Sequence, residues 1–171
     1  FHPTNCRFNH LINMKTITGN ISRGFLIVLS LLFFSSCSEN DLNAEEIYFE
    51  SIARHYLSTG EDFSEQQLVI RDRESWEELL AQLNSVNDQT KYFSRTEFNF
   101  SEEILLVVID KFRPNGGHSI AVSTLLEKDD EVIAFITKPQ QGNETTMVMQ
   151  PYHIISIEKT NKNIGFVKEY K

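Results

Sequence analysis

The feature that most limits how this chain can fold is a run of six apolar residues at positions 104–109 (ILLVVI). A strand with one wet face alternates apolar and polar residues, but this run contains no polar position. It is therefore predicted to be a central strand whose two faces are both covered by other parts of the chain. At 171 residues, the chain is long enough for one domain to supply these covers.

An amphipathic helix is predicted around positions 76–83, before the apolar run. Its large apolar residues recur at intervals of three and four positions, at Trp76, Leu79, Leu80 and Leu83. Such spacing places them on one face of a helix and leaves charged residues on the other. Asp72 can cap the N-terminus with its carboxylate, and a capping box of Ser75 and Glu78 is the alternative. The apolar face, including Trp76, is expected to pack on a sheet.

Segments typical of strands lie before the helix and after the apolar run. They are expected at positions 67–71, 118–126, 131–138, 145–149, 152–158 and 164–167. Positions 47–56 fit a strand and a helix about equally well. Short connections after the helix predict antiparallel neighbours. The predicted fold class is therefore α+β, with one amphipathic helix packed on a mostly antiparallel β-sheet or partly closed barrel.

The first 36 residues differ in character from the rest of the chain. Positions 1–13 show no helical or strand period and are interpreted as sequence upstream of a true start at Met14, or else as a disordered tail. From Met14, a positive segment leads into ten apolar residues at 25–34 (FLIVLSLLFF). Ten residues are too few to span a bilayer but are typical of a signal peptide, which is assigned to positions 14–36.

The residues that follow resemble the lipobox of bacterial lipoproteins, with a bulky Phe34, two small serines and then Cys37. The resemblance implies cleavage between Ser36 and Cys37, lipidation of the Cys37 thiol, and anchoring to the outer membrane through the N-terminal lipid. The alternative is an ordinary signal peptide with a chance cysteine. Positions 37–46 are then interpreted as the lipidated cysteine and an acidic tether, and positions 47–171 as the globular domain.

Charge and cysteine content argue against several classes of function. Removal of positions 1–36, which hold three bases and no acid, leaves 13 bases against 24 acids, a net charge of −11. Such an acidic domain is not expected to bind nucleic acid. With Cys6 removed and Cys37 acylated, no thiol remains for catalysis, a disulfide or a metal site. The acidic tether favours display of the domain on the cell surface. The alternative is a domain that faces the periplasm. Protease added to intact cells distinguishes these two locations, because it digests only a domain on the surface.

The sequence offers no constellation that indicates an enzyme, a cofactor or a metal. No two of His55, His118 and His153 stand at the spacing of a helical metal site. A Gly-x-Ser-x-Gly elbow for a nucleophile is also missing. The strongest local signal is instead a turn at positions 111–117 (KFRPNGG), where a proline and an Asn-Gly pair suit a tight reversal of the chain.

Positions 47–167 resemble the protease complex subunit PrcB family of bacterial lipoproteins. The matching pieces include Val69-Ile70-Arg71 before the helix, positions 99–101 before the apolar strand, and two loop motifs. The first motif, similar to the family's Arg-Pro-Thr-Gly-Gly-Tyr signature, consists of Arg113, Pro114, Asn115, Gly116, Gly117 and His118. The second, similar to the family's Pro-Tyr-His ending, consists of Pro151, Tyr152 and His153. Asn115 and His118 depart from the family pattern, in which Thr and Tyr are usual.

The resemblance implies an accessory lipoprotein without enzymatic activity, whose partner is an envelope or surface protein such as a protease complex. The residues of the two motifs are then the candidate binding residues, and the first motif and the loop at 139–145 are expected to flank strands of one sheet. A purely structural turn is the alternative for that motif. A second function class is a protease inhibitor, because the Arg-Pro-Asn-Gly-Gly loop is faintly similar to the Pro-Thr-Thr-Gly loops of chagasin-like inhibitors.

Overall fold

The apolar run forms β4 (Glu103–Ile109), an interior strand of a four-stranded sheet with the order β2-β7-β4-β3. The structure is a computed structural model that describes residues 44–58 and 63–170. The other strands of this first sheet are β2 (Glu50–Leu57), β3 (Gln66–Ile70) and β7 (Gln150–Glu158). All neighbouring strands in it run antiparallel. Positions 47–56, which the sequence left open, thus contribute mainly a strand.

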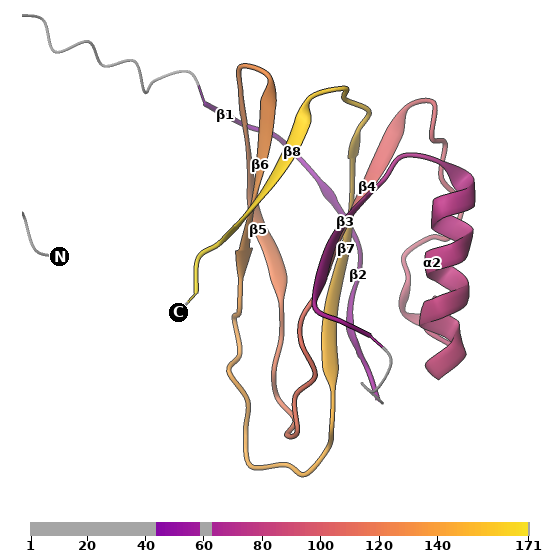
Figure 1. The fold of residues 1–171 in the computed structure, drawn as a ribbon, viewed down its shortest axis with the longest axis vertical. Coiled ribbons are helices and arrows are strands. Elements are labelled where there is room, and N and C mark those ends of the chain that lie inside the picture. Colours follow the sequence, from indigo (N-terminus) through magenta and orange to yellow (C-terminus); the bar gives the residue numbers. More distant parts are fainter. Residues whose placement is uncertain (1–43, 59–62, 171) are drawn as a thin grey trace, which may run out of the picture. The chain divides into compact units, whose positions relative to one another are not determined.

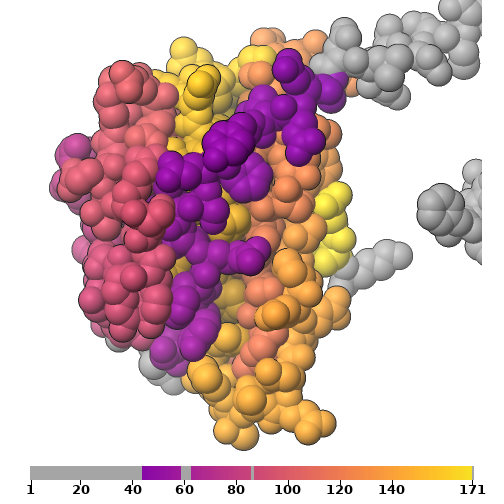
Figure 2. Space-filling model, turned by 180° about the vertical axis from the view of Figure 1, so that it is seen from behind, coloured from indigo at the N-terminus to yellow at the C-terminus, as the bar shows by residue number. Residues whose placement is uncertain are grey.

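A second four-stranded sheet, with the order β1-β5-β6-β8, packs on one face of the first (Figure 1). Its strands are β1 (Glu45–Glu46), β5 (Ala121–Lys128), β6 (Glu131–Thr137) and β8 (Asn163–Lys168). β5 and β6 form an antiparallel hairpin, whereas β8 runs parallel to β6. The chain passes from β1 at the edge of this sheet to β2 at the edge of the first, which Figure 2 shows in indigo and purple.

The predicted helix is α2 (Arg73–Val86), and it covers the other face of the first sheet (Figure 1). Asp72 is its N-cap, because the Asp72 carboxylate accepts a hydrogen bond of 2.8 Å from the backbone N–H of Ser75. This hydrogen bond lowers the pKa of Asp72. Trp76 is buried, with its indole N–H donating to the carbonyl of Thr96 at 3.1 Å. The helix and the structural role of Trp76 are as predicted.

The side chains of β4 divide between two separate cores. Leu105, Val107 and Ile109 pack in the cluster beneath α2, and the alternate residues Ile104, Leu106 and Val108 pack in the cluster between the two sheets. All six have no exposed surface. The prediction of a central strand covered on both faces is therefore confirmed, and the α+β class with it.

Several finer expectations were wrong. Both sheets are open where the structure describes them, so the barrel alternative is not what the chain forms. The turn at 111–117 does not join paired strands, because β4 and β5 belong to different sheets. Positions 145–148 contain no strand. Glu45 and Glu46, assigned to the tether, pair with β5 and extend the folded domain by two residues. Positions 37–43 of the tether and the signal peptide lie outside the described residues.

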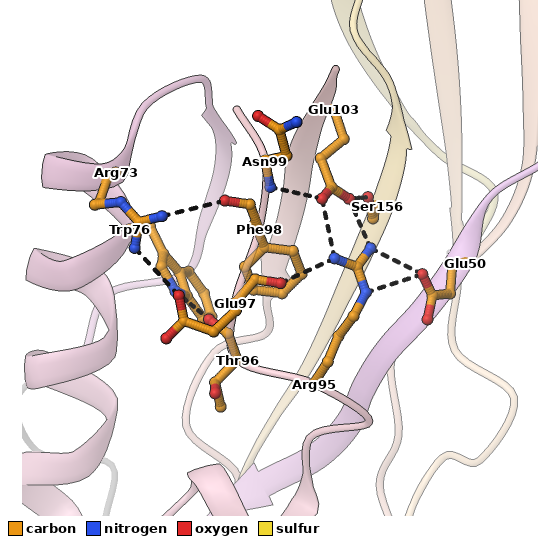
Figure 3. A network of polar contacts seen from close by, with 10 residues as sticks. All are labelled: Glu50, Arg73, Trp76, Arg95, Thr96, Glu97, Phe98, Asn99, Glu103 and Ser156. Carbon is orange, nitrogen blue, oxygen red and sulfur yellow. Dashed lines mark hydrogen bonds and ion pairs between the residues drawn. The ribbon is translucent and has the colours of Figure 1, made fainter. Parts of the chain in front are cut away.

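A partly buried ion-pair network fixes the long connection between α2 and β4 (Figure 3). The Arg95 guanidinium bridges Glu50 of β2 and Glu103 of β4, with Nη2 at 2.9 Å and 2.6 Å from their carboxylates. Glu103 also accepts hydrogen bonds from Ser156 Oγ of β7 and from the backbone N–H of Asn99. The hydrogen bond from Arg95 lowers the pKa of Glu103 to about 2, although burial opposes this effect. Arg95 thus joins β2 and β4 to the connection, and Glu103 adds β7 through Ser156.

Replacing Arg95 with Met should lower the free energy of unfolding by about 2 kcal/mol at pH 7, because Glu103 would remain partly buried without its partner. Urea unfolding followed by tryptophan fluorescence measures this loss. The matched control is Arg73→Met, which removes an exposed partner of Glu97 and should cost less than about 0.5 kcal/mol. Equal effects of the two substitutions would contradict the assigned role of Arg95.

Candidate functional site

Two segments that cross between the sheets lie side by side and form one structure, here called the paired loops (residues 111–120 and 138–149). Arg113 and Met149 exchange two backbone hydrogen bonds of 2.8 and 3.0 Å. Further backbone hydrogen bonds join Gly116 to Thr145 and Asn143, Gly117 to Gly142, and Ser119 to Gln140. The first loop motif and the loop at 139–145 are thus paired with each other, and both flank strands of one sheet, β5 and β6, as the sequence predicted. Figure 1 shows both segments at the end of the sheets.

Glycines permit this close approach of the two segments. Gly117 and Gly142 have φ angles of 74° and 102°, a region that residues with a side chain rarely adopt. A Cβ atom on Gly142 would lie 2.5 Å from Nε2 of His118, and one on Gly116 would collide with Oγ1 of Thr145. The two glycines of the first motif therefore serve the pairing of the loops and do not themselves indicate a ligand.

A buried carboxylate holds the base of the paired loops. Asp110 has no exposed side-chain surface, and its two oxygens lie 2.7 Å from Nη2 of Arg113 and 2.8 Å from Nζ of Lys138. Burial raises the pKa of Asp110, but the hydrogen bonds from Lys138 and Arg113 outweigh it and leave the pKa below its ordinary value. Lys138 also lies over the ring of Tyr170, 3.9 Å from its centroid. Arg113, a candidate binding residue, is therefore committed to holding the loop.

The two residues that depart from the family pattern contact each other. Nε2 of His118 lies 3.1 Å from Oδ1 of Asn115, and Nδ2 of Asn115 donates a hydrogen bond of 2.8 Å to the carbonyl of Asn143. Burial, and next the charge of Arg113, lower the pKa of His118. A neutral His118 that donates from Nε2 thus links both paired loops through Asn115.

A hollow of about 470 Å³ lies between the paired loops and the edge strand β2. Its lining includes Arg54, His118, Gln140 and Asn143 as polar groups and Ile120, Met147 and Met149 as apolar ones. Figure 2 views the molecule from the side of β2, with the orange loop residues at the lower end. Next to it, the ring of His55 is stacked on Tyr56 and Tyr92, with centroids 4.6 and 3.5 Å apart.

Large apolar side chains are exposed around these loops. Phe112, Met147 and Val148 keep 41%, 49% and 37% of their surface accessible. Sequence reasoning did not identify Phe112, Met147, Arg54 or the aromatic stack. No local signal marks them, because they come together only through the pairing of distant segments.

The second motif lies inside the fold and not at this surface. Pro151, Tyr152 and His153 are all buried residues of β7. The Tyr152 hydroxyl donates to Oε1 of Gln89 at 2.8 Å, and burial raises its pKa. The expectation that these three residues bind a partner is therefore corrected: each already contacts the protein interior. Ser36 and Cys37 lie outside the described residues.

His153 joins the two sheets, and the proton on its ring is not placed for the ring to act as a general base toward Ser51. Its Nδ1 accepts a 2.9 Å hydrogen bond from the backbone N–H of Val122 on β5, so the ring proton must be on Nε2. Nε2 lies 2.9 Å from Oγ of Ser51 and therefore donates to that hydroxyl. A general base would have to accept the serine proton at this nitrogen. The hydrogen bond between Ser51 and His153 is therefore structural.

No group of three or more His, Cys, Asp or Glu is placed to hold a metal ion within the described ranges. Over those ranges, the chain also has no helix long and apolar enough to cross a membrane.

Comparisons with protein-family models, with curated proteins and with solved structures found no match for this chain. The likeness to the PrcB family therefore rests on the motifs quoted above.

The environment of His153 predicts a loss of stability in mild acid. Burial lowers its pKa to about 4 from an ordinary 6.5, so between these values the unfolded chain binds a proton that the folded chain does not. The free energy of unfolding should fall by roughly 3 kcal/mol as the pH drops from 6.5 to 4. In His153→Asn, whose amide oxygen can still accept from Val122, this dependence should be weaker in urea unfolding.

The matched control for this experiment is His55→Asn, at a histidine on the neighbouring strand. His55 is only partly buried and stacks on tyrosines. This variant should retain the pH dependence of the wild type. The same pH dependence in wild type and His153→Asn would refute the role assigned to His153.

Proposed function

We propose that this protein is a non-enzymatic accessory lipoprotein of the bacterial envelope that binds a partner protein through its paired loops. The observation that carries the proposal is the exposure of Phe112, Met147 and Val148 on segments that are otherwise fixed by backbone hydrogen bonds. Methionine and aromatic residues are enriched in protein interfaces. All three exposed side chains belong to the paired loops.

Rigidity of the paired loops supports a binding role. Association costs free energy when loops must be ordered at the interface. Here the buried Asp110 pairs with Arg113 and Lys138, and close loop contacts surround Gly116, Gly117 and Gly142. The loops are therefore ordered before a partner arrives, which reduces that cost.

The resemblance of the chain to the PrcB family supports a particular kind of partner. Members of that family are lipoproteins named for a subunit of a surface protease complex, so an envelope or surface protein, with a protease complex as the first candidate, is the proposed partner. Lipidation at Cys37 would hold the domain at the outer membrane. The proton arrangement of Ser51 and His153 supports a role without hydrolysis.

The inhibitor alternative has less support. The arginine of the Arg-Pro-Asn-Gly-Gly loop, Arg113, is not free to enter the active site of a protease. That side chain is bound to Asp110 and only 17% exposed. We therefore place partner binding ahead of inhibition.

Photo-crosslinking in intact cells tests the proposal. A photoreactive residue at position 147 should capture a defined envelope protein, because Met147 is half exposed at the proposed interface. The matched control is position 82, an exposed glutamine on α2, which lies on the opposite side of the first sheet from the second sheet. Capture of the same proteins from both positions, or of none from position 147, would contradict the proposed interface.

A further inference from the structure

The hollow beside the paired loops differs in charge from the rest of the domain. None of its 13 lining residues is an aspartate or glutamate. Another hollow, at the opposite end of the strands, is lined by two cations, Arg95 and Lys159, and by seven glutamates: Glu45, Glu46, Glu50, Glu102, Glu103, Glu127 and Glu158. In a sequence with 24 acids and 16 bases, an acid-free hollow is a local exception.

One cation at this hollow is not used by the fold. Arg54 lies on β2 opposite His153 of β7 and is exposed. Directly opposite residues of antiparallel strands point to the same face, and His153 contacts Val122 of the second sheet. Among the described residues, Arg54 forms no ion pair with a carboxylate. Its five N–H donors are therefore available to a ligand at the mouth of the hollow.

The remaining lining suits a peptide. Gln140 and Asn143 carry side-chain amides, which can meet a peptide backbone, and both are exposed. Met147 presents an adaptable apolar surface, with the buried Ile120 and Met149 beneath the same hollow. A ligand that satisfies these groups combines one carboxylate with an apolar side chain close to it.

We infer that this hollow binds an acidic segment of the partner protein, in which an aspartate or glutamate side chain pairs with Arg54 and a neighbouring apolar side chain packs against Met147. The inference rests on the proposed function and specifies the partner chemistry at the same surface. The glutamate-lined hollow repels such a segment, so the charge pattern also sets the orientation of the partner.

The binding test uses the full lipoprotein in a non-ionic detergent and three rhodamine-labelled peptides. The first, Ser-Gly-Ser-Leu-Asp-Leu-Ser-Gly-Ser with both ends blocked, carries the inferred determinant. The second replaces Asp with Asn, and the third, Ser-Gly-Ser-Leu with a free carboxyl end, offers a terminal carboxylate. Fluorescence anisotropy should show saturable binding of the Asp peptide, weakened about tenfold by Arg54→Gln. Arg73→Gln, which removes an exposed guanidinium on α2, should not weaken it.

The outcomes separate the possibilities. Equal affinity for the Asp and Asn peptides, no binding of the Asp peptide, or equal effects of Arg54→Gln and Arg73→Gln would each overturn the inference. Tighter binding of the peptide with the free carboxyl end would also overturn it, since the site would then recognise a chain terminus.

A second measurement distinguishes failure of this inference from failure of the proposed function. Arg54→Gln should reduce the yield of the crosslink from position 147 in intact cells about tenfold, whereas Arg54→Lys, which keeps the charge, should retain most of it. If the crosslink forms equally well in Arg54→Gln, the inference fails but partner binding by the paired loops stands. If no crosslink forms in the wild type, it is the proposed function that fails.

Discussion

The burial of β4 on both faces is the constraint on which the rest of this structure depends. A strand with six apolar positions is stable only where two other layers remove both faces from water. Here α2 covers one face and the second sheet covers the other. Because β5 and β6 of the second sheet lie between β4 and β7 in the sequence, the chain must leave the first sheet after Ile109 and return to it at Gln150.

These two crossings produce the candidate site. The outgoing and returning segments run side by side at one end of the sheets and pair with each other (Figure 1). The two connections between the sheets therefore form one ordered surface. The polar groups at its base are placed where β4 ends: Asp110 follows the last residue of the strand and pairs with Arg113 from the outgoing segment and Lys138 from the returning one. The charge of a buried carboxylate thereby fastens both loops to the core.

Local patterns were sufficient to predict α2, its Asp72 cap and the central strand, since each depends on residues close together in sequence. For the first loop motif and positions 139–145, the sequence predicted only that both flank strands of one sheet, and not that they pair. The partner assignment of each strand was not predictable, because hairpin-length gaps do not reveal when consecutive strands belong to different sheets. The burial of Tyr152 and His153 was missed for a related reason: β7 is central, and its neighbours β2 and β4 lie far away in the sequence. Arg54 and Met147 likewise have no local signal.

Hydrogen exchange of the protein without any partner tests most directly the claim that the paired loops are ordered in advance. The backbone N–H groups of Gly116, Ser119 and Asn143 each donate to a carbonyl of the opposite segment. If the loops are paired, these amides should exchange far more slowly than those of an unstructured peptide, and Gly142→Ala, which forces a side chain against His118, should accelerate their exchange. Exchange at the unstructured rate in the wild type would show that the loops do not pair, and would contradict the account.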